Sequence, residues 1–312
     1  MLGRFPTGAL VILLCGAPSA ALLALEAAPA PPPARIVNGT PTTDYPAVGM
    51  LVIGGTLCTA TLIGCSTVLT AAHCFCAPAD TFRQCQRAGL PDPSKVVFLS
   101  QYALPVQASR FAIHSDYNFG IAGDVAVVTL SQPVTGIPLA ALNRSQKPPL
   151  HTPATIVGFG RTGGPSDQFP EVGIKRVGSV EIAACPTSGD QSIPPANHLC
   201  FRVLTADDAG TCNGDSGGPL LVDLGAGPVV AGVASGIEAG RVDCLPVAID
   251  FDTDVYRYRE FIDQQLGNDT RSVCGDLPAV GAAGTSVRAE QGTIQPGARS
   301  MRSRRNLATK MP

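Results

Sequence analysis

The chain has 312 residues, a formal net charge of −2 and only 15% charged residues. This balance excludes the strongly basic surface that nucleic acids require, so we expect no nucleic-acid partner. Eleven cysteines are too many for an ordinary cytosolic protein and indicate an oxidising compartment. The length allows one large all-β domain or two small domains. The 34 glycines and 28 prolines among short apolar runs favour many short strands.

Residues 1–20 are typical of a secretory signal peptide. Arg4 precedes an apolar run from Ala9 to Leu14, which is too short to cross a membrane as a helix. We therefore expect a secreted protein, extracellular or periplasmic, with no stable membrane insertion. Cleavage after Ala20 and cleavage after Ala28 both fit the pattern. Cys15 lies in this segment, so its removal leaves ten of the eleven cysteines, enough for five disulfides.

Residues 21–35 are predicted to be a propeptide. Their Pro-rich part, 27–34, cannot build a core and is typical of an extended spacer. The segment ends at Arg35, directly before Ile36-Val-Asn-Gly-Thr. A basic residue between a Pro-rich leader and an apolar dipeptide indicates a processing site, and an ordinary loop arginine is the alternative.

The next segment, to about residue 130, contains five strand-like runs: Ala47–Ile53, Thr59–Ile63, Thr67–Leu69, Val96–Leu99 and Val125–Leu130. Between the third and fourth runs lies His73, in Thr-Ala-Ala-His-Cys. A histidine that follows an apolar strand beside a cysteine favours catalysis over a structural role. The segment Phe75–Ser94 contains Cys76 and Cys85 and is predicted to be a disulfide-tied insertion.

Asp124 directly precedes the last of these runs, so we expect it to be buried. A buried carboxylate requires a partner. Histidine fits chemically because a carboxylate fixes its tautomer and stabilises the imidazolium. The alternative is an aspartate that caps a strand. Four further residues lack comparable contexts and are predicted to be surface or loop residues: His114, Asp116, His151 and His198.

A second set of six strand-like runs follows: Ala154–Phe159, Lys175–Ile182, His198–Val203, Leu220–Val222, Val229–Ser235 and Val247–Phe251. Residues 253–266 show a clear helical period, with Thr253 or Asp254 as the N-cap and Gly267 at the end. After Cys274 the chain becomes Gly/Ala-rich and then basic. Residues 275–312 are therefore predicted to be a disordered tail, with contact to an anionic surface as the weaker alternative.

The stretch from Gly210 to Pro219 places four glycines around one serine, Ser216. Glycine lets the backbone turn tightly and bring its N–H groups close to a ligand. A serine in such a turn can be an exposed nucleophile with amide donors beside it, as acyl transfer requires. A Gly-rich surface loop is the alternative.

His73, Asp124 and Ser216 occur in that order within Thr-Ala-Ala-His-Cys, Gly-Asp-Val-Ala-Val-Val and Gly-Asp-Ser-Gly-Gly-Pro. Together with Arg35-Ile36-Val-Asn-Gly, these motifs resemble the trypsin/chymotrypsin family of serine endopeptidases over about residues 36–266. The resemblance implies an all-β fold of two packed six-stranded antiparallel barrels with a C-terminal α-helix, in a protease domain spanning residues 36–274. It places the site in the cleft between the barrels.

The resemblance also implies the catalytic roles. Ser216 is expected to attack the scissile carbonyl, His73 to accept and return its proton, and Asp124 to orient His73. The N–H groups of Gly214 and Ser216 are expected to form the oxyanion hole.

The resemblance also implies how the protein is activated. Cleavage after Arg35 by an activating protease is expected to free the amine of Ile36, which would pair with Asp215. The uncleaved chain is then an inactive zymogen. We expect protein or peptide substrates and a monomer.

The resemblance suggests the disulfides Cys58–Cys74, Cys185–Cys200 and Cys212–Cys244. Four cysteines remain with three possible pairings: Cys65, Cys76, Cys85 and Cys274. Pairing Cys76 with Cys85 closes a short local loop and leaves Cys65–Cys274 as a guess. No Glu lies in residues 75–95, so a calcium site is not expected, nor is any other metal or cofactor.

The residues at the primary pocket depart from the trypsin pattern. Gly210 stands where trypsin-like members carry a selecting aspartate, whereas Asp250 is placed across the same pocket, with Thr211 beside it and Gly236 at its entrance. This exchange resembles elastase-like enzymes and broad-specificity crustacean collagenases, and a residual basic preference stays open. Ala234-Ser-Gly236 stands where the family has Ser-Trp-Gly, so an apolar platform for the substrate is expected to be lost.

Two other classes of function were considered, of which the first remains as the alternative and the second fails. A catalytically silent, protease-like binding module generally lacks a triad residue, and none is missing here. A lipase-type Gly-x-Ser-x-Gly elbow places its histidine after the serine, and no histidine follows Ser216. An active endopeptidase is the favoured hypothesis.

Overall fold

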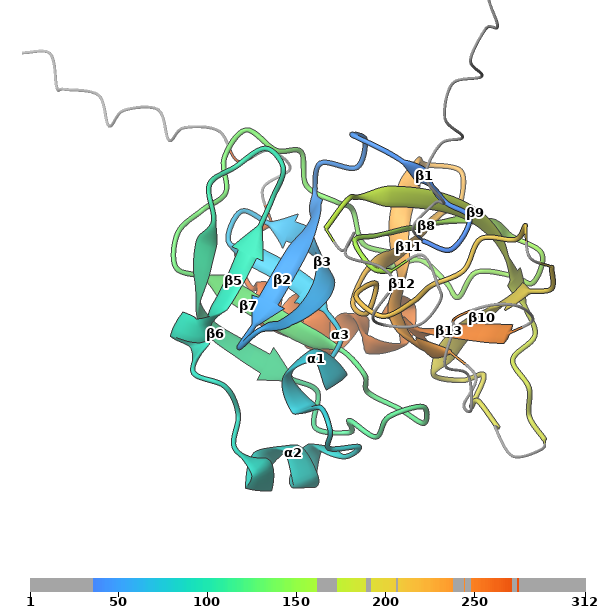
Figure 1. Cartoon of the computed structure of the whole chain (residues 1–312), viewed down its shortest axis with the longest axis horizontal. Helices are drawn as coiled ribbons and strands as arrows, with labels where there is room; N and C mark the ends of the chain where they lie inside the picture. The colour runs from blue at the N-terminus through green and yellow to red at the C-terminus, as the bar shows by residue number, and fades with distance from the viewer. Residues whose placement is uncertain are drawn as a thin grey trace, which may run out of the picture.

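A computed structural model describes residues 36–161, 173–188, 192–205, 207–237, 244, 248–270 and 274. The predicted signal peptide, the propeptide with Arg35, and the tail from 275 to 312 lie outside the described residues. Figure 1 shows two β-barrels side by side, with the first half of the chain in one and the second half in the other.

The first barrel closes in the order β2-β3-β4-β7-β6-β5, with antiparallel neighbours throughout. Its strands are β2 (Val48–Ile53), β3 (Thr56–Gly64), β4 (Thr67–Thr70), β5 (Val96–Leu99), β6 (Val106–Ile113) and β7 (Ala126–Leu130). Five of these were predicted. Strand β6 was not predicted, because its residues are only partly buried and form no continuous apolar run.

The second barrel contains the six remaining long strands: β8 (Pro153–Gly158), β9 (Arg176–Ala183), β10 (His198–Val203), β11 (Pro219–Asp223), β12 (Pro228–Ile237) and β13 (Ala248–Asp254). The sheet runs β9-β10-β13-β12-β11-β8, and an antiparallel β8–β9 pairing closes it. The short β1 (Thr40–Pro41) adds to β9. The prediction of two six-stranded antiparallel barrels is confirmed.

Helix α3 (Val255–Leu266) carries the only long helical period expected from the sequence. Asp254 caps it by accepting from the Tyr256 N–H, and Gly267 ends it with a φ of +56°. Its buried face, which includes Tyr258 and Ile262, joins the large core cluster that contains the first barrel and residues of β11 and β12.

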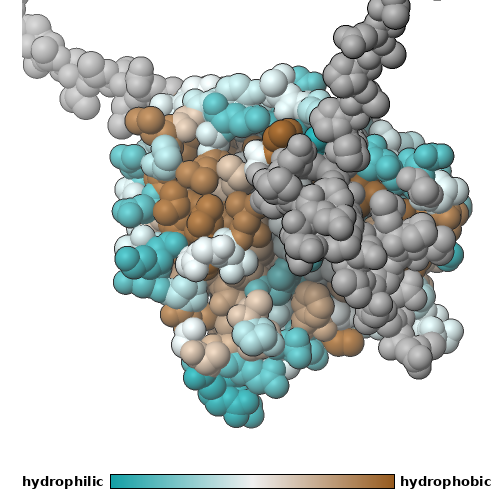
Figure 2. All heavy atoms as spheres, viewed as in Figure 1, coloured by the Kyte–Doolittle hydropathy of each residue, from teal (hydrophilic) through white to brown (hydrophobic). Residues whose placement is uncertain are grey.

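Two short helices lie in the predicted insertion between β4 and β5, α1 (His73–Cys76) and α2 (Phe82–Ala88). Cys85 alone is buried in α2. Figure 2 shows hydrophilic residues over the lower projection of the molecule, where α2 lies. The insertion therefore packs on the barrel through its cysteines while α2 faces solvent.

Five disulfides join the ten cysteines that follow the leader: Cys58–Cys74, Cys65–Cys274, Cys76–Cys85, Cys185–Cys200 and Cys212–Cys244. They are the three pairs that the resemblance suggested and the two that were chosen among the remaining alternatives. None of the helices that the structure describes is long and apolar enough to cross a membrane.

The prediction that His198 is a surface or loop residue is wrong. It lies in β10 and is 1% exposed. Its ring packs edge-on against Phe251 at 5.5 Å, and its Nδ1 lies 3.0 Å from the Pro194 carbonyl. Burial lowers the pKa of His198, so this residue is a neutral packing group in the strand.

Candidate active site

The first barrel positions His73 and Asp124 against each other. His73 begins α1 directly after β4, and Asp124 lies just before β7, the strand that pairs with β4. The Nδ1 of His73 lies 2.7 Å from Asp124 Oδ2, and its backbone N–H donates to Oδ1 at 2.9 Å. Because a carboxylate only accepts, Nδ1 carries the proton and Nε2 is left available.

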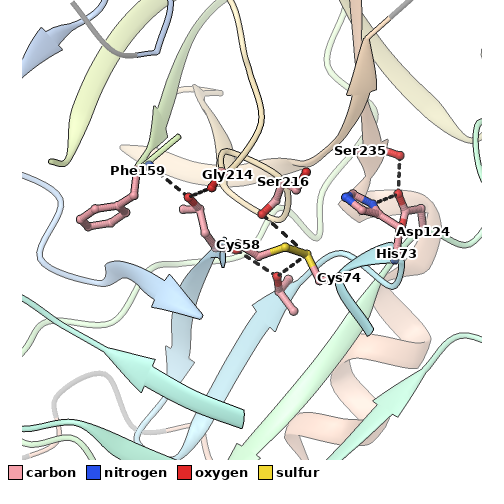
Figure 3. Close-up of a disulfide and its surroundings, with 10 residues drawn as sticks. Cys58, His73, Cys74, Asp124, Phe159, Gly214, Ser216 and Ser235 are labelled. Atoms are coloured by element: carbon pink, nitrogen blue, oxygen red, sulfur yellow. Dashed lines mark hydrogen bonds and ion pairs between the residues drawn. A yellow bond between two sulfur atoms is a disulfide. The ribbon is translucent and has the colours of Figure 1, made fainter. Parts of the chain in front are cut away.

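The Asp124 carboxylate has a third hydrogen bond, from a residue that was not predicted to lie there. Ser235, in β12, donates its hydroxyl to Asp124 Oδ2 at 2.5 Å. Figure 3 shows the His73 ring between the Asp124 carboxylate and Ser216, with Ser235 above the carboxylate. Residues 234–236 were predicted only to be a substrate-pairing strand, and nothing local in the sequence indicates the contact across the barrels.

The electrostatics favour an ionised Asp124 although it is fully buried. Burial alone would raise the pKa of this carboxyl. The positive charge available on His73 and the hydrogen bonds from His73 and Ser235 outweigh that effect and hold the pKa below its usual value. Asp124 therefore fixes the orientation of the His73 ring. Only 17% of the His73 side chain is exposed.

Ser216 comes from the second barrel and is anchored to the first by Thr59. The Thr59 N–H donates to the Ser216 carbonyl at 2.8 Å, and its hydroxyl donates to the Gly214 carbonyl at 2.8 Å. The Cys58–Cys74 disulfide lies alongside, with Cys74 Sγ 3.9 Å from the Ser216 carbonyl (Figure 3). Within the described residues no hydrogen bond joins Ser216 Oγ to His73, a contact that often tightens only with substrate bound.

Two backbone amides beside Ser216 are free to meet a ligand. The N–H groups of Gly214 and Ser216 donate to no oxygen of the described residues. Gly214 has a φ of +99°, and a Cβ there would lie 2.9 Å from the Gly160 Cα. Glycine is required at this position both by the backbone conformation and by the close approach of the neighbouring loop.

Asp215 points away from Ser216 into the second barrel. Its carboxylate accepts from the N–H groups of Gly160 at 2.7 Å and Cys212 at 2.9 Å. Burial is the main reason that its pKa rises to about 7, and the two hydrogen bonds oppose that rise only in part.

The segment that follows Arg35 enters the same barrel. Ile36 is fully buried in its apolar core, and Val37 forms a bridge to Gly210, whose N–H donates to the Val37 carbonyl at 3.1 Å. The first residues after the predicted cleavage point therefore contact the start of the serine loop.

A cavity of about 300 Å³ adjoins His73 and Ser216, and its wall includes Thr211 and Gly236. Two other pocket candidates, Gly210 and Asp250, lie behind that wall. Asp250 is 1% exposed and accepts from the Thr211 N–H at 2.6 Å and its hydroxyl at 2.9 Å. Ile237 and Phe119 also line the cavity, and the sequence analysis named neither.

The part of the chain that the structure describes contains one grouping of possible metal ligands, Cys58, His73 and Cys74. The two cysteines are bonded to each other, so His73 is the only member that retains a ligand atom. These residues do not fit a metal ion.

Comparison with known proteins identifies the family. The family described as Trypsin matches residues 36–262. The chain belongs to the trypsin family. It is 31% identical over 235 residues to Cercarial protease of Schistosoma mansoni, covering 70% of this chain and 84% of that protein.

Other relatives agree. Brachyurin of Leptuca pugilator is 29% identical over 228 residues, which cover 67% of this chain and 88% of that protein. Serine protease 56 of Mus musculus is 31% identical over 195 residues, but the match spans only 31% of its length. Membership of the trypsin family makes the chain a serine-type endopeptidase.

Proposed function

We propose that His73, Asp124 and Ser216 are the catalytic triad of this trypsin-family protease. The observation that carries the proposal is the pairing of His73 with Asp124 on the cavity that also holds Ser216. His73 Nε2 accepts the Ser216 proton as Oγ attacks the scissile carbonyl, and it then donates that proton to the leaving amine. The free N–H groups of Gly214 and Ser216 bind the oxyanion, and water releases the acyl group from Ser216.

Covalent labelling tests the triad. Protein cleaved after Arg35 is incubated with a fluorophosphonate, and labelled peptides are mapped. We expect one label, on Ser216, and none in Ser216→Ala. Cleaved, folded protein that takes no label would instead support the alternative of a catalytically silent binding module.

Activation is proposed to follow cleavage after Arg35 by another protease. Buried Ile36 and the raised pKa of Asp215 support this step. Among the described residues the Asp215 carboxylate accepts from two backbone N–H groups, and a new ammonium group would neutralise it. We expect Arg35→Gln protein to stay unlabelled. Cleaved Ile36→Asp protein should also be inactive, and strong activity in it would contradict the mechanism.

The cavity supports a broad, elastase-like preference over a basic one. The carboxylate that could attract a Lys or Arg side chain is that of Asp250. It lies behind the cavity wall and already accepts two hydrogen bonds from Thr211. Profiling a peptide library with cleaved enzyme should show preference for uncharged side chains at the scissile position. A basic preference that disappears in Asp250→Ala would place this carboxylate in the pocket.

The leader and tail complete the proposal. Residues 1–20 would direct secretion, 21–35 would be the propeptide, 36–274 the protease domain, and 275–312 a disordered tail. The protease would act on proteins or peptides as a monomer.

A further inference from the structure

The hydroxyl of Thr59 joins two segments of the second barrel, although Thr59 itself lies in β3 of the first. Its Oγ1 donates to the Gly214 carbonyl at 2.8 Å and accepts from the Phe159 N–H at 3.1 Å. The dashed lines that meet between Phe159 and Gly214 in Figure 3 are these two bonds. Because an amide N–H can only donate, the single hydroxyl proton must point to Gly214. Thr59 is fully buried, so its hydroxyl is shielded from water.

The peptide group between Gly214 and Asp215 is held at both ends. The Thr59 hydroxyl holds its carbonyl oxygen. Its N–H, which belongs to Asp215, donates to the Cys212 carbonyl at 2.9 Å. Since both polar groups of this peptide are bonded, its plane is fixed on the C-terminal side of the Gly214 Cα.

The peptide group on the other side of Gly214 is held through its carbonyl. The Arg161 N–H donates to the Asn213 carbonyl at 2.9 Å. In a trans peptide the N–H points opposite to the carbonyl, so the Gly214 N–H is directed away from Arg161. It donates to no oxygen of the described residues, and Asn213 beside it lines the cavity that adjoins Ser216. The orientation of this free donor therefore depends on bonds made at both sides of Gly214.

Thr59 also bonds to Ser216, through its backbone. The Thr59 N–H donates to the Ser216 carbonyl at 2.8 Å. Gly214 and Ser216, which supply the two free amides, are thus both bonded to one residue of the opposite barrel. Any residue except proline could make the backbone bond, whereas the bond to Gly214 requires a side-chain donor. The hydroxyl is therefore the part of Thr59 that a substitution can test.

We propose that the Thr59 hydroxyl is a positioning group for the oxyanion hole, which holds the Gly214 N–H in the orientation that binds the developing oxyanion. This inference rests on the proposed function and deepens it. Thr59 does not touch the substrate and acts through Gly214. A donor that is oriented beforehand needs no reorganisation when charge develops on the carbonyl oxygen. The hydroxyl should therefore contribute to the chemical step more than to substrate binding.

The test removes the hydroxyl and measures kcat and KM separately on one peptide anilide with cleaved enzyme. In Thr59→Val, kcat should fall by about 10- to 100-fold, less than the roughly 10²–10³-fold caused by outright loss of an oxyanion donor. KM should change by less than about twofold, because the interaction is made in the transition state. A peptide aldehyde, whose adduct with Ser216 places an oxygen in the oxyanion hole, should lose affinity in parallel with kcat/KM. Thr59→Ser keeps the hydroxyl and should keep most of the wild-type kcat.

Thr67→Val is the matched control. Thr67 is also buried in the first barrel, and its hydroxyl donates to the Asp269 carboxylate at 2.7 Å, away from the cavity. Its kcat should stay at the wild-type value even where stability falls. Thr59→Ala removes the hydroxyl from a smaller side chain and carries the same prediction if Thr59→Val does not fold.

Three results overturn this inference alone, in enzyme whose wild type takes the fluorophosphonate on Ser216. They are an unchanged kcat in the Thr59 variants that lack the hydroxyl, a loss confined to KM, and an equal loss of kcat in Thr67→Val. Absence of both labelling and hydrolysis in the wild-type enzyme overturns the proposed function as well.

Discussion

Asp124 is the residue on which the hydrogen bonds of the site converge. Its carboxylate accepts hydrogen bonds from the ring and the backbone N–H of His73. It also accepts one from the hydroxyl of Ser235, which belongs to the other barrel. Its backbone is held as well, since Thr253 donates its hydroxyl to the Asp124 carbonyl at 2.8 Å. The carboxylate is therefore oriented before substrate arrives, which is the condition for preorganised catalysis.

Removing the Ser235 hydroxyl should weaken this orientation. In Ser235→Ala we expect kcat to fall about tenfold, since a hydrogen bond to a charged group is lost. The pKa of Asp124 should rise, because one of the hydrogen bonds that stabilise its charged form is lost, and the acid limb of the kcat–pH profile should move to higher pH. Ser109→Ala, whose hydroxyl bonds only strand carbonyls far from the site, is the control. An unchanged profile in Ser235→Ala would refute the role.

The raised pKa of Asp215 should make the free energy of unfolding of the uncleaved chain depend on pH. Its pKa rises from 3.8 to about 7 on folding, so its contribution is fully present below about pH 4 and is lost as the pH rises through 7. The loss is at most about 4 kcal/mol. Urea unfolding of Arg35→Gln protein between pH 4 and 8 should show it. Adding Asp215→Asn should flatten the profile, and equal slopes in the two proteins would contradict the prediction.

At the scale of elements, helix α3 attaches the last described segment of the chain to the barrels. Its buried face packs into a core cluster that joins the first barrel to strands β11 and β12 of the second. Tyr258 also accepts from the Gly123 N–H at 2.7 Å, directly before Asp124. The helix therefore supports both stability and the backbone of the site.

Two residues of α3 provide a matched comparison. Ile262 is 0% exposed, so Ile262→Ala should lower the free energy of unfolding by about 2–5 kcal/mol. The Glu260 side chain is 88% exposed, and Glu260→Ala should change it by no more than about 0.5 kcal/mol. Guanidinium unfolding with the disulfides intact measures both. Similar losses in the two variants would show that α3 does not dock as described.

The sequence predicted those elements whose signal is local. Continuous apolar runs marked β4 and β7, and Asp254 and Gly267 marked the ends of α3. Strand β6 was missed because one side of it faces solvent. A strand or helix can be predicted from the sequence only where its own residues form an apolar run or carry the residues that mark its ends.

Contacts between elements explain what the sequence could not predict. His73 and Ser216 were found from motifs, but Ser235 reaches Asp124 only because β12 packs against the first barrel. Phe119 and Phe251 meet only because a loop of one barrel lies over a strand of the other. Each of these contacts requires the docked pair of barrels.

At the scale of the whole molecule, the first strand and the last helix of the described residues each contact the opposite half of the fold. Strand β1 precedes the first barrel but pairs with β9 of the second. Helix α3 follows the second barrel and packs into the core cluster that contains the first barrel and strands β11 and β12 (Figure 1). The Cys65–Cys274 disulfide closes the end of the domain onto the first barrel. This arrangement keeps His73 and Asp124 of one barrel facing Ser216 of the other.

The most direct test of this account is a double-mutant comparison across the barrels. Hydrolysis of one peptide is measured for cleaved wild-type enzyme, His73→Ala, Ser216→Ala and the double variant. Because residues that act as one unit are strongly non-additive, each single variant should lose about 10⁶-fold in kcat and the double variant no more. Losses that multiply in the double variant, or a Ser216→Ala enzyme that keeps its activity, would contradict the account.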